Sequence, residues 1–88
     1  MDVRRAIGTN IKRFRLAADL SQEAVAERMG VDRAYVSGLE RGERNPTVVT
    51  LWHVAQALGV EIPMLFADFH AAGVDAPKPS RKRATKRS

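Results

Sequence analysis

Small, polar and basic side chains recur at helical spacing between residues 33 and 41, namely at Arg33, Ala34, Ser37, Gly38 and Arg41. Residues three or four apart lie on the same face of an α-helix, so these five would share one face. The chemistry of such a face is hydrogen-bond donation, because a guanidinium can donate two parallel N–H bonds to a pair of acceptor atoms. This stretch therefore predicts a recognition surface.

The rest of the composition does not favour an enzyme. The chain has two histidines, His53 and His70, no cysteine and no cluster of carboxylates. No nucleophile with its base and no acid–base pair is therefore apparent. Without cysteine, neither a disulfide framework nor a thiolate metal site is possible. We expect no enzymatic activity, no metal and no cofactor.

Two short helices joined by a tight turn must position the recognition surface. Ser21 is a good N-cap, because its hydroxyl can accept from the free amides of the first helical turn, and a helix then runs from Gln22 to about Met29. Gly30 predicts a left-handed helix end. Asp32 is the expected N-cap of the next helix, which runs from Arg33 to about Glu40.

Three further helices complete an expected all-α fold of five helices. The first runs from Val3 to Ala18, the fourth from Val48 to Leu58 after a Thr47 cap, and a short fifth from about Ile62. The spacing of apolar residues also predicts which positions are buried. These are Ile7, Ile11, Phe14 and Ala18 in the first helix, Val25, Ala26 and Met29 in the second, Val36 and Leu39 in the third, and Leu51, Val54, Ala55 and Leu58 in the fourth.

The C-terminal residues differ in composition from the rest. From Gly73 onward the chain is rich in proline, alanine and positive charge, so residues 73–88 are expected to form a disordered tail. The whole net charge of +5 lies in residues 75–88, and the preceding residues are neutral overall. Bulk charge therefore gives no argument about the folded part. The tail would either add phosphate contacts or serve only as a solubilising end.

Length and hydropathy set the remaining bounds. Eighty-eight residues make one small domain. No apolar run is long enough to span a membrane, and the N-terminus lacks the apolar core of a secretory signal. We expect a cytoplasmic protein.

Residues 7–66 resemble the Cro/CI-type (XRE) helix-turn-helix family of phage and bacterial repressors. The residues that carry the resemblance are Gln22, Ala26, Gly30, Val36 and Leu39, the LERG run at 39–42, Asn45-Pro46 and the run TLWHVAQALGV at 50–60. The resemblance implies a lambda-repressor-like domain over residues 1–72, with the helix-turn-helix at the second and third helices. The implied function is sequence-specific binding of double-stranded DNA by a transcriptional regulator on the bacterial nucleoid.

The resemblance also implies roles for single residues. The positions that would face base edges are Arg33, Ala34, Ser37 and Gly38. Of these, Arg33 can donate two bonds to guanine O6 and N7. The positions that would face phosphates are Gln22, Tyr35, Arg41, Arg44 and Asn45.

Some of these residues have plainer alternatives. Arg33 could be a solvated first-turn residue, Tyr35 could pack on the core edge, and Arg44 and Asn45 could simply form the loop. The family also pairs a buried arginine of the first helix with a glutamate that ends the third. In this chain the corresponding residues are Arg15 and Glu40.

Surplus apolar residues near the C-terminus predict a dimer interface made by Ile62, Met64, Phe69 and Trp52. Leu65 and Phe66 are expected to be buried in the core instead. Family members usually bind as dimers, and a single small module makes few base contacts. We therefore expect a homodimer on a palindromic operator.

The type of regulator is less well determined by the sequence. The run DRAYVSGLERGERN at 32–45 is also similar to controller proteins of restriction-modification systems, although phage, plasmid and chromosomal regulators share much of it. A repressor or autoregulator is the interpretation we favour. The alternative is an antitoxin-type interaction module of the same fold, and membrane binding through the tail ranks third. No effector domain is recognised, so no small-molecule effector is expected.

Overall fold

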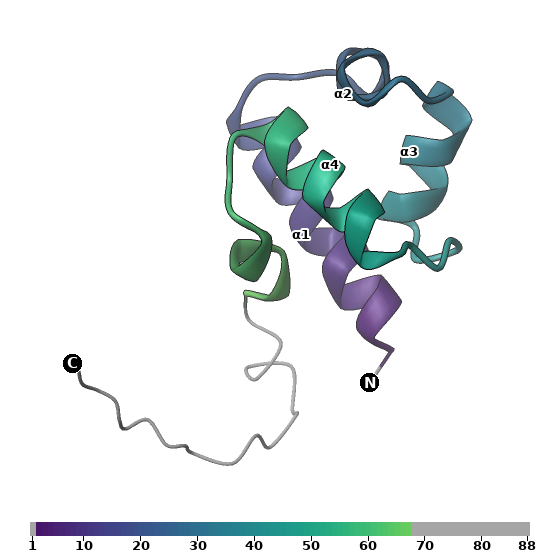
Figure 1. The fold of residues 1–88 in the computed structure, drawn as a ribbon, viewed down its shortest axis with the longest axis vertical. Coiled ribbons are helices and arrows are strands. Elements are labelled where there is room, and N and C mark those ends of the chain that lie inside the picture. The colour runs from purple at the N-terminus through teal and green to yellow at the C-terminus, as the bar shows by residue number, and fades with distance from the viewer. Residues whose placement is uncertain (1, 68–88) are drawn as a thin grey trace, which may run out of the picture.

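The structure is a computed structural model that describes residues 2–67 of the chain. Its helices are α1 (Val3–Ala17), α2 (Gln22–Met29), α3 (Arg33–Glu40) and α4 (Val48–Leu58), followed by the 3-10 helix η1 (Ile62–Phe66). In Figure 1, α1 and α4 lie against each other, with α2 and α3 on one side and η1 on the other. No strand occurs among residues 2–67, so the all-α prediction is confirmed for the described part.

The caps explain why the helix boundaries were predictable. The Ser21 hydroxyl accepts from the Ala24 amide at 3.0 Å, and the Thr47 hydroxyl accepts from the Thr50 amide at 3.0 Å. Gly30 ends α2 in the left-handed conformation at φ 74°. Asp32 is different: it occupies the N-cap position of α3, but its side chain makes no capping hydrogen bond.

The short fifth helix predicted from about Ile62 is present, but η1 is a 3-10 helix of five residues and not an α-helix. The Nδ2 atom of buried Asn10 donates to the carbonyl oxygens of Leu65 at 2.9 Å and Ala67 at 2.7 Å. These carbonyls are therefore bonded to a side chain of α1. Leu65 and Phe66 are neighbours in the chain, and neighbouring side chains of a helix point to different sides. Leu65 is fully buried, whereas Phe66 is 37% exposed, contrary to expectation.

The core fills the space between α1, α4 and the α2–α3 pair. Its fully buried side chains are Ile11, Val25, Val36, Val54 and Leu65. All predicted positions of α3 and α4 are buried, but Phe14 and Met29 are only half-buried. Ala18 lies beyond the end of α1 and is exposed. None of the helices in residues 2–67 has the length and hydropathy that crossing a membrane would need.

Gly8 allows α1 to approach the end of α3 closely. A β-carbon at this position would lie 2.4 Å from the Leu39 carbonyl oxygen and 2.7 Å from that of Glu40. Both neighbours are backbone atoms, so a larger residue at position 8 would force the two helices apart. The position of α3 therefore depends on a glycine in another helix.

Two of the predictions concern residues beyond position 67. Phe69, predicted for the dimer interface, lies outside the described residues, and so does the predicted tail at 73–88.

Candidate nucleic-acid interface

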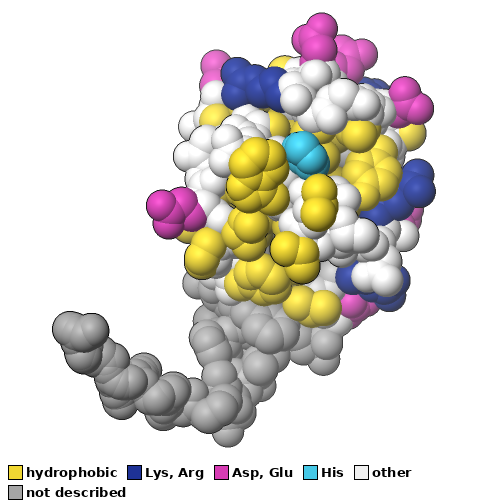
Figure 2. Space-filling model, viewed as in Figure 1, with side chains coloured by type: hydrophobic (Ala, Val, Ile, Leu, Met, Phe, Trp, Pro, Cys, Tyr) yellow, Lys and Arg dark blue, Asp and Glu magenta, His cyan; other side chains and the backbone are white. Residues whose placement is uncertain are grey.

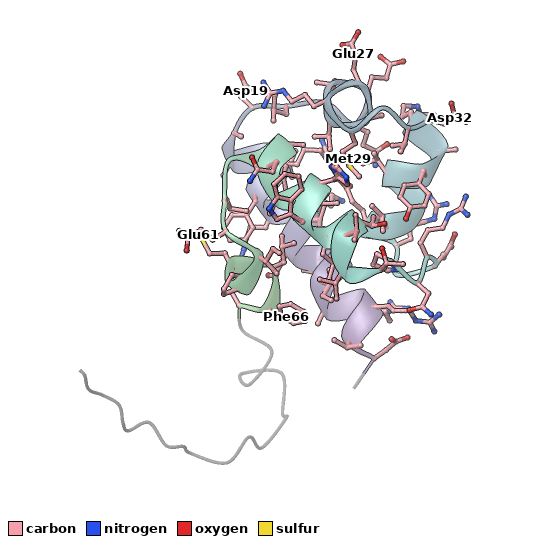
Figure 3. All side chains as sticks on the ribbon, viewed as in Figure 1. Asp19, Glu27, Met29, Asp32, Glu61 and Phe66 are labelled. Carbon is pink, nitrogen blue, oxygen red and sulfur yellow. The ribbon has the colours of Figure 1, made fainter. Side chains whose placement is uncertain are left out.

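The inner and outer sides of α3 differ sharply. Val36 and Leu39 are buried in the core, which fixes the helix to the domain. On the outer side, Arg33 and Ala34 are exposed, and Tyr35 and Ser37 are half-buried. Arg41, Arg44 and Asn45 follow the helix and are also exposed. Figure 3 shows α3 along one edge of the domain, beginning beside the labelled Asp32. The structure thus brings the predicted residues of α3 and its following loop onto one edge.

A buried ion pair joins α1 to the last residue of α3. Arg15 donates to Glu40 through Nε at 2.5 Å and through Nη2 at 3.1 Å. The two side chains are 10% and 4% exposed. The Arg15 Nη1 atom donates to the Leu20 carbonyl at 2.9 Å, which also fastens the connection between α1 and α2.

Gln22 extends this ion pair to the beginning of α3. Its Nε2 atom donates to Glu40 Oε1 at 3.1 Å, and its Oε1 atom accepts from Arg33 Nη1 at 3.0 Å. Arg33 is therefore connected through Gln22 and Glu40 to the interior of the domain. One bond still leaves donors for a ligand, because a guanidinium carries five N–H groups.

A hollow of about 590 Å³ lies at the N-terminus of α2, where a phosphate contact was predicted. It is lined by Arg15, Ser21, Gln22, Glu23 and Arg33. The amides of a first helical turn and the helix dipole both favour an anion at such a place. Arg33 adds positive charge at the hollow, whereas the charge of Arg15 is paired with Glu40 and Glu23 contributes a carboxylate.

The C-terminal end of α3 carries two more arginines. Arg41 donates to the Ser37 hydroxyl and, at 3.0 Å, to Glu43 Oε1. The hydrogen bond and charge of Arg41 lower the pKa of the exposed Glu43 carboxyl. The guanidinium of Arg44 lies over the ring of Tyr35, 5.1 Å from its centroid. Positively charged side chains thus lie at both ends of α3. The major groove of B-DNA is wide enough to admit a helix of this kind.

Comparison with known proteins agrees with this geometry. A family profile described as helix-turn-helix (HTH_3) matches residues 11–65, which include α2, α3 and α4. The chain belongs to this helix-turn-helix family. Its members regulate transcription by binding DNA, so the protein is a DNA-binding transcriptional regulator of the repressor and controller type and not an enzyme.

Individual relatives support the same assignment. The chain is 53% identical over 60 residues to an uncharacterized HTH-type transcriptional regulator, y4dJ, of Sinorhizobium fredii. The aligned residues make up 68% of this chain and 78% of the relative. The chain is 40% identical over 65 residues to control protein C.SmaI of Serratia marcescens, with coverage of 74% and 77%. The crystal structure of the restriction-modification controller protein C.AhdI from Aeromonas hydrophila matches with a TM-score of 0.69 and 41% identity, over 72% of this chain and 96% of that chain.

Sequence reasoning missed several residues that position the interface. Gly8 stands in the interior of a predicted helix, where glycine is disfavoured, and this could have indicated a close approach. Asn10 is a polar residue next to the predicted apolar stripe of α1, and it is 3% exposed. Arg28 donates to the Ala57 carbonyl at 2.8 Å and so joins α2 to α4, a contact that no local pattern indicates.

Proposed function

We propose that the protein binds a palindromic DNA operator as a homodimer and represses or autoregulates transcription. The observation that carries this proposal is the outer side of α3, which presents arginines at both ends while its inner side is anchored in the core. With α3 in the major groove, Arg33 at its first turn reads guanine, and Ala34 and Ser37 face neighbouring bases.

Phosphate contacts on either side of the groove would set the register of the domain. Gln22 with the hollow at the start of α2 lies at one end, and Arg41, Arg44 and Asn45 lie at the other. Tyr35 is half-buried between them. These contacts carry no sequence information, so base preference rests mainly on Arg33, with DNA shape contributing the remainder.

The experiment for base reading compares Arg33→Ala with Lys12→Ala, which removes an exposed positive charge from α1 instead. Binding sites are selected from random double-stranded DNA with each variant. Wild type and Lys12→Ala should give the same palindromic consensus. Arg33→Ala should lose a guanine preference and about 1–3 kcal/mol of binding free energy. An unchanged consensus for Arg33→Ala would refute base reading by this residue.

A footprint on DNA upstream of the protein's own gene tests autoregulation. Protection of a palindrome that overlaps the promoter is the expected result. Protection with no sequence preference, or at a site without two-fold symmetry, would contradict the proposal.

An exposed apolar face over α4 and η1 supports a homodimer. Figure 2 shows hydrophobic side chains gathered on the side where α4 and η1 lie. The exposed large side chains of these helices are Val48, Val49, Trp52, Met64 and Phe66. Of the predicted interface residues, Trp52 and Met64 belong to this group, whereas Ile62 is half-buried and packs against the core. Contiguous apolar surface of this kind is typical of protein interaction sites.

A hollow of about 330 Å³ in the same region would accept side chains of a second copy. It is lined by Trp52, Ala55, Gln56, Val60, Glu61, Ile62 and Pro63. Two-fold symmetry suits this surface, because a palindromic operator presents two equal half-sites about one helical turn apart.

Sedimentation at micromolar concentration tests the dimer. Met64→Glu should shift the protein to monomer and weaken operator binding, because it places a charge in the apolar face. Leu16→Glu is the matched control, since Leu16 is 58% exposed but belongs to α1. A wild type that stays monomeric both free and on DNA would refute the homodimer.

A further inference from the structure

Gly38 is buried although it belongs to the outer side of α3. The atoms that cover it belong to Arg44, which comes from the loop after the helix. A β-carbon at Gly38 would lie 3.0 Å from both Cγ and Nε of Arg44 and 3.5 Å from its Cδ. The first two distances are shorter than ordinary van der Waals contact, so a β-carbon at position 38 would require the Arg44 side chain to shift by a few tenths of an ångström.

The backbone of Gly38 does not itself require glycine. Its φ is outside the left-handed range, in contrast to Gly30, Gly42 and Gly59. Glycine is also disfavoured in the interior of a helix relative to alanine. Contact with Arg44 therefore explains the residue better than backbone conformation does.

Two further contacts hold Arg44 in this place. Its guanidinium lies 5.1 Å from the centroid of the Tyr35 ring, within the range of a cation–π interaction. The Glu43 amide donates to the Gly38 carbonyl at 2.9 Å, so the chain just before Arg44 is bonded to the end of α3. Tyr35 and Gly38 are three residues apart, so they lie side by side on the helix surface and together form the contact site for Arg44.

We propose that Gly38 is a positioning residue for DNA recognition that acts through Arg44. The missing β-carbon lets the loop arginine lie across the outer side of α3, against Tyr35, so its charge reaches the groove in a fixed place. This inference rests on the proposed function of α3. A side chain at position 38 would push Arg44 away from the helix surface and weaken its contact with Tyr35, so that more of the arginine has to be ordered when DNA binds.

A simpler role for Gly38 would be to let DNA approach the helix directly. The two roles differ in their dependence on Arg44. If Gly38 acts through Arg44, an added methyl group matters only while Arg44 is present. If DNA itself needs the space, the methyl group is equally harmful without Arg44.

A double-mutant cycle separates these roles. Operator affinity is measured for wild type, Gly38→Ala, Arg44→Ala and the double variant. Gly38→Ala should weaken binding about three- to tenfold, as expected for one side chain that is no longer pre-ordered, and should have no effect in the Arg44→Ala background. In an Arg41→Ala background the loss should equal that in wild type, because Arg41 bonds to Ser37 and Glu43 instead.

The melting temperature distinguishes a positioning role from a structural one. Gly38→Ala should melt at the same or a higher temperature than wild type, because alanine favours a helix. If the role of Gly38 were purely structural, the substitution would lower the melting temperature together with the DNA affinity. An unchanged operator affinity, or an equal loss in the Arg44→Ala background, would overturn the proposal.

A measurement without DNA keeps the test independent of the proposed function. The Nε–Hε resonance of Arg44 should be shifted by the ring current of Tyr35 in the ¹H–¹⁵N spectrum of wild type. Both Gly38→Ala and Tyr35→Leu should move it to the position of a solvated arginine. A resonance that Gly38→Ala leaves unchanged would overturn the inference even if the wild type binds its operator. Failure of the wild type to bind any palindrome, with the shift still lost in Gly38→Ala, would instead refute the proposed function.

Discussion

Replacement of Glu40 by glutamine should be among the most destabilising single changes at the edge of the core. The Glu40 carboxylate accepts from Arg15 Nε at 2.5 Å, from Arg15 Nη2 at 3.1 Å and from Gln22 Nε2 at 3.1 Å. Its side chain is 4% exposed and that of Arg15 is 10% exposed. Glutamine keeps the shape but removes the charge, and its amide group points N–H donors at donors of Arg15.

The expected loss follows from leaving Arg15 buried without its counter-charge. Breaking a buried pair by removing one partner costs about 3–5 kcal/mol. A domain of this size loses about 4–8 °C in melting temperature for each kcal/mol. The melting temperature should therefore fall by at least about 12 °C. Because domains have only about 5–15 kcal/mol in total, this loss removes a large part of the stability of the fold.

Urea unfolding followed by circular dichroism at a helical wavelength measures the effect. The midpoint should fall while the slope stays constant, which indicates a change in stability and not in the denatured state. Glu43→Gln is the matched control, because Glu43 pairs with Arg41 on the surface with side chains 60% and 56% exposed. Surface pairs contribute little, so the control should unfold at the wild-type midpoint. A loss below about 1 kcal/mol for Glu40→Gln would refute the reasoning.

Two other perturbations test the support of α1. Gly8→Ala places a β-carbon 2.4 Å from the Leu39 carbonyl oxygen and should lower the free energy of unfolding by about 1–3 kcal/mol. Thr9→Ala, on the exposed side of α1, should leave the free energy of unfolding unchanged. Equal melting temperatures for the two variants would contradict this prediction. Asp2 caps α1 by accepting from the Arg4 amide at 3.0 Å, and its hydrogen bonds to Arg4 lower the pKa of its carboxyl. A lowered folded-state pKa stabilises the fold above the ordinary carboxyl pKa, and this is lost as pH falls through the lowered value. The difference in stability between wild type and Asp2→Ala should accordingly shrink on acidification, and a pH-independent difference would argue against the cap.

Helix boundaries were predictable because their signals are local. Ser21 and Thr47 accept from amides three residues later, and Gly30 and Gly59 adopt the left-handed conformation at helix ends. Each of these choices is decided within one helical turn. The sequence therefore predicted where α2, α3 and α4 begin and approximately where they end. Asp32 shows, however, that a suitable residue at an N-cap position need not form the capping bond.

The attachment of the 3-10 helix η1 depends on a contact distant in sequence. Asn10 bonds to carbonyls 55 and 57 residues away and so ties the end of η1 to α1. With the 3-10 turn, Phe66 faces outward and adds to the apolar face. A pattern of apolar residues cannot distinguish periods of 3.0 and 3.6 over so short a segment.

The arrangement of the recognition residues was predictable only in part. Helical spacing placed Arg33 and Ser37 on one side of α3. It could not show that Gln22 joins Arg33 to Glu40, or that Arg44 covers Gly38, because both depend on how the loop and α2 pack against α3. Side chains of arginine have many rotamers, and tertiary neighbours decide among them.

The stability of α3 comes almost entirely from its inner side. A helix of eight residues is too short to persist alone, and this one has a glycine in its interior and no side-chain N-cap bond. Val36 and Leu39, the contact with Gly8 and the Arg15–Glu40 pair hold it in place. Arg33, Ala34 and Ser37 on the outer side take no part in these contacts, whereas Tyr35 packs against the edge of the core. Substitutions of the first three should change operator preference at little cost in stability, whereas substitutions on the inner side should impair both together.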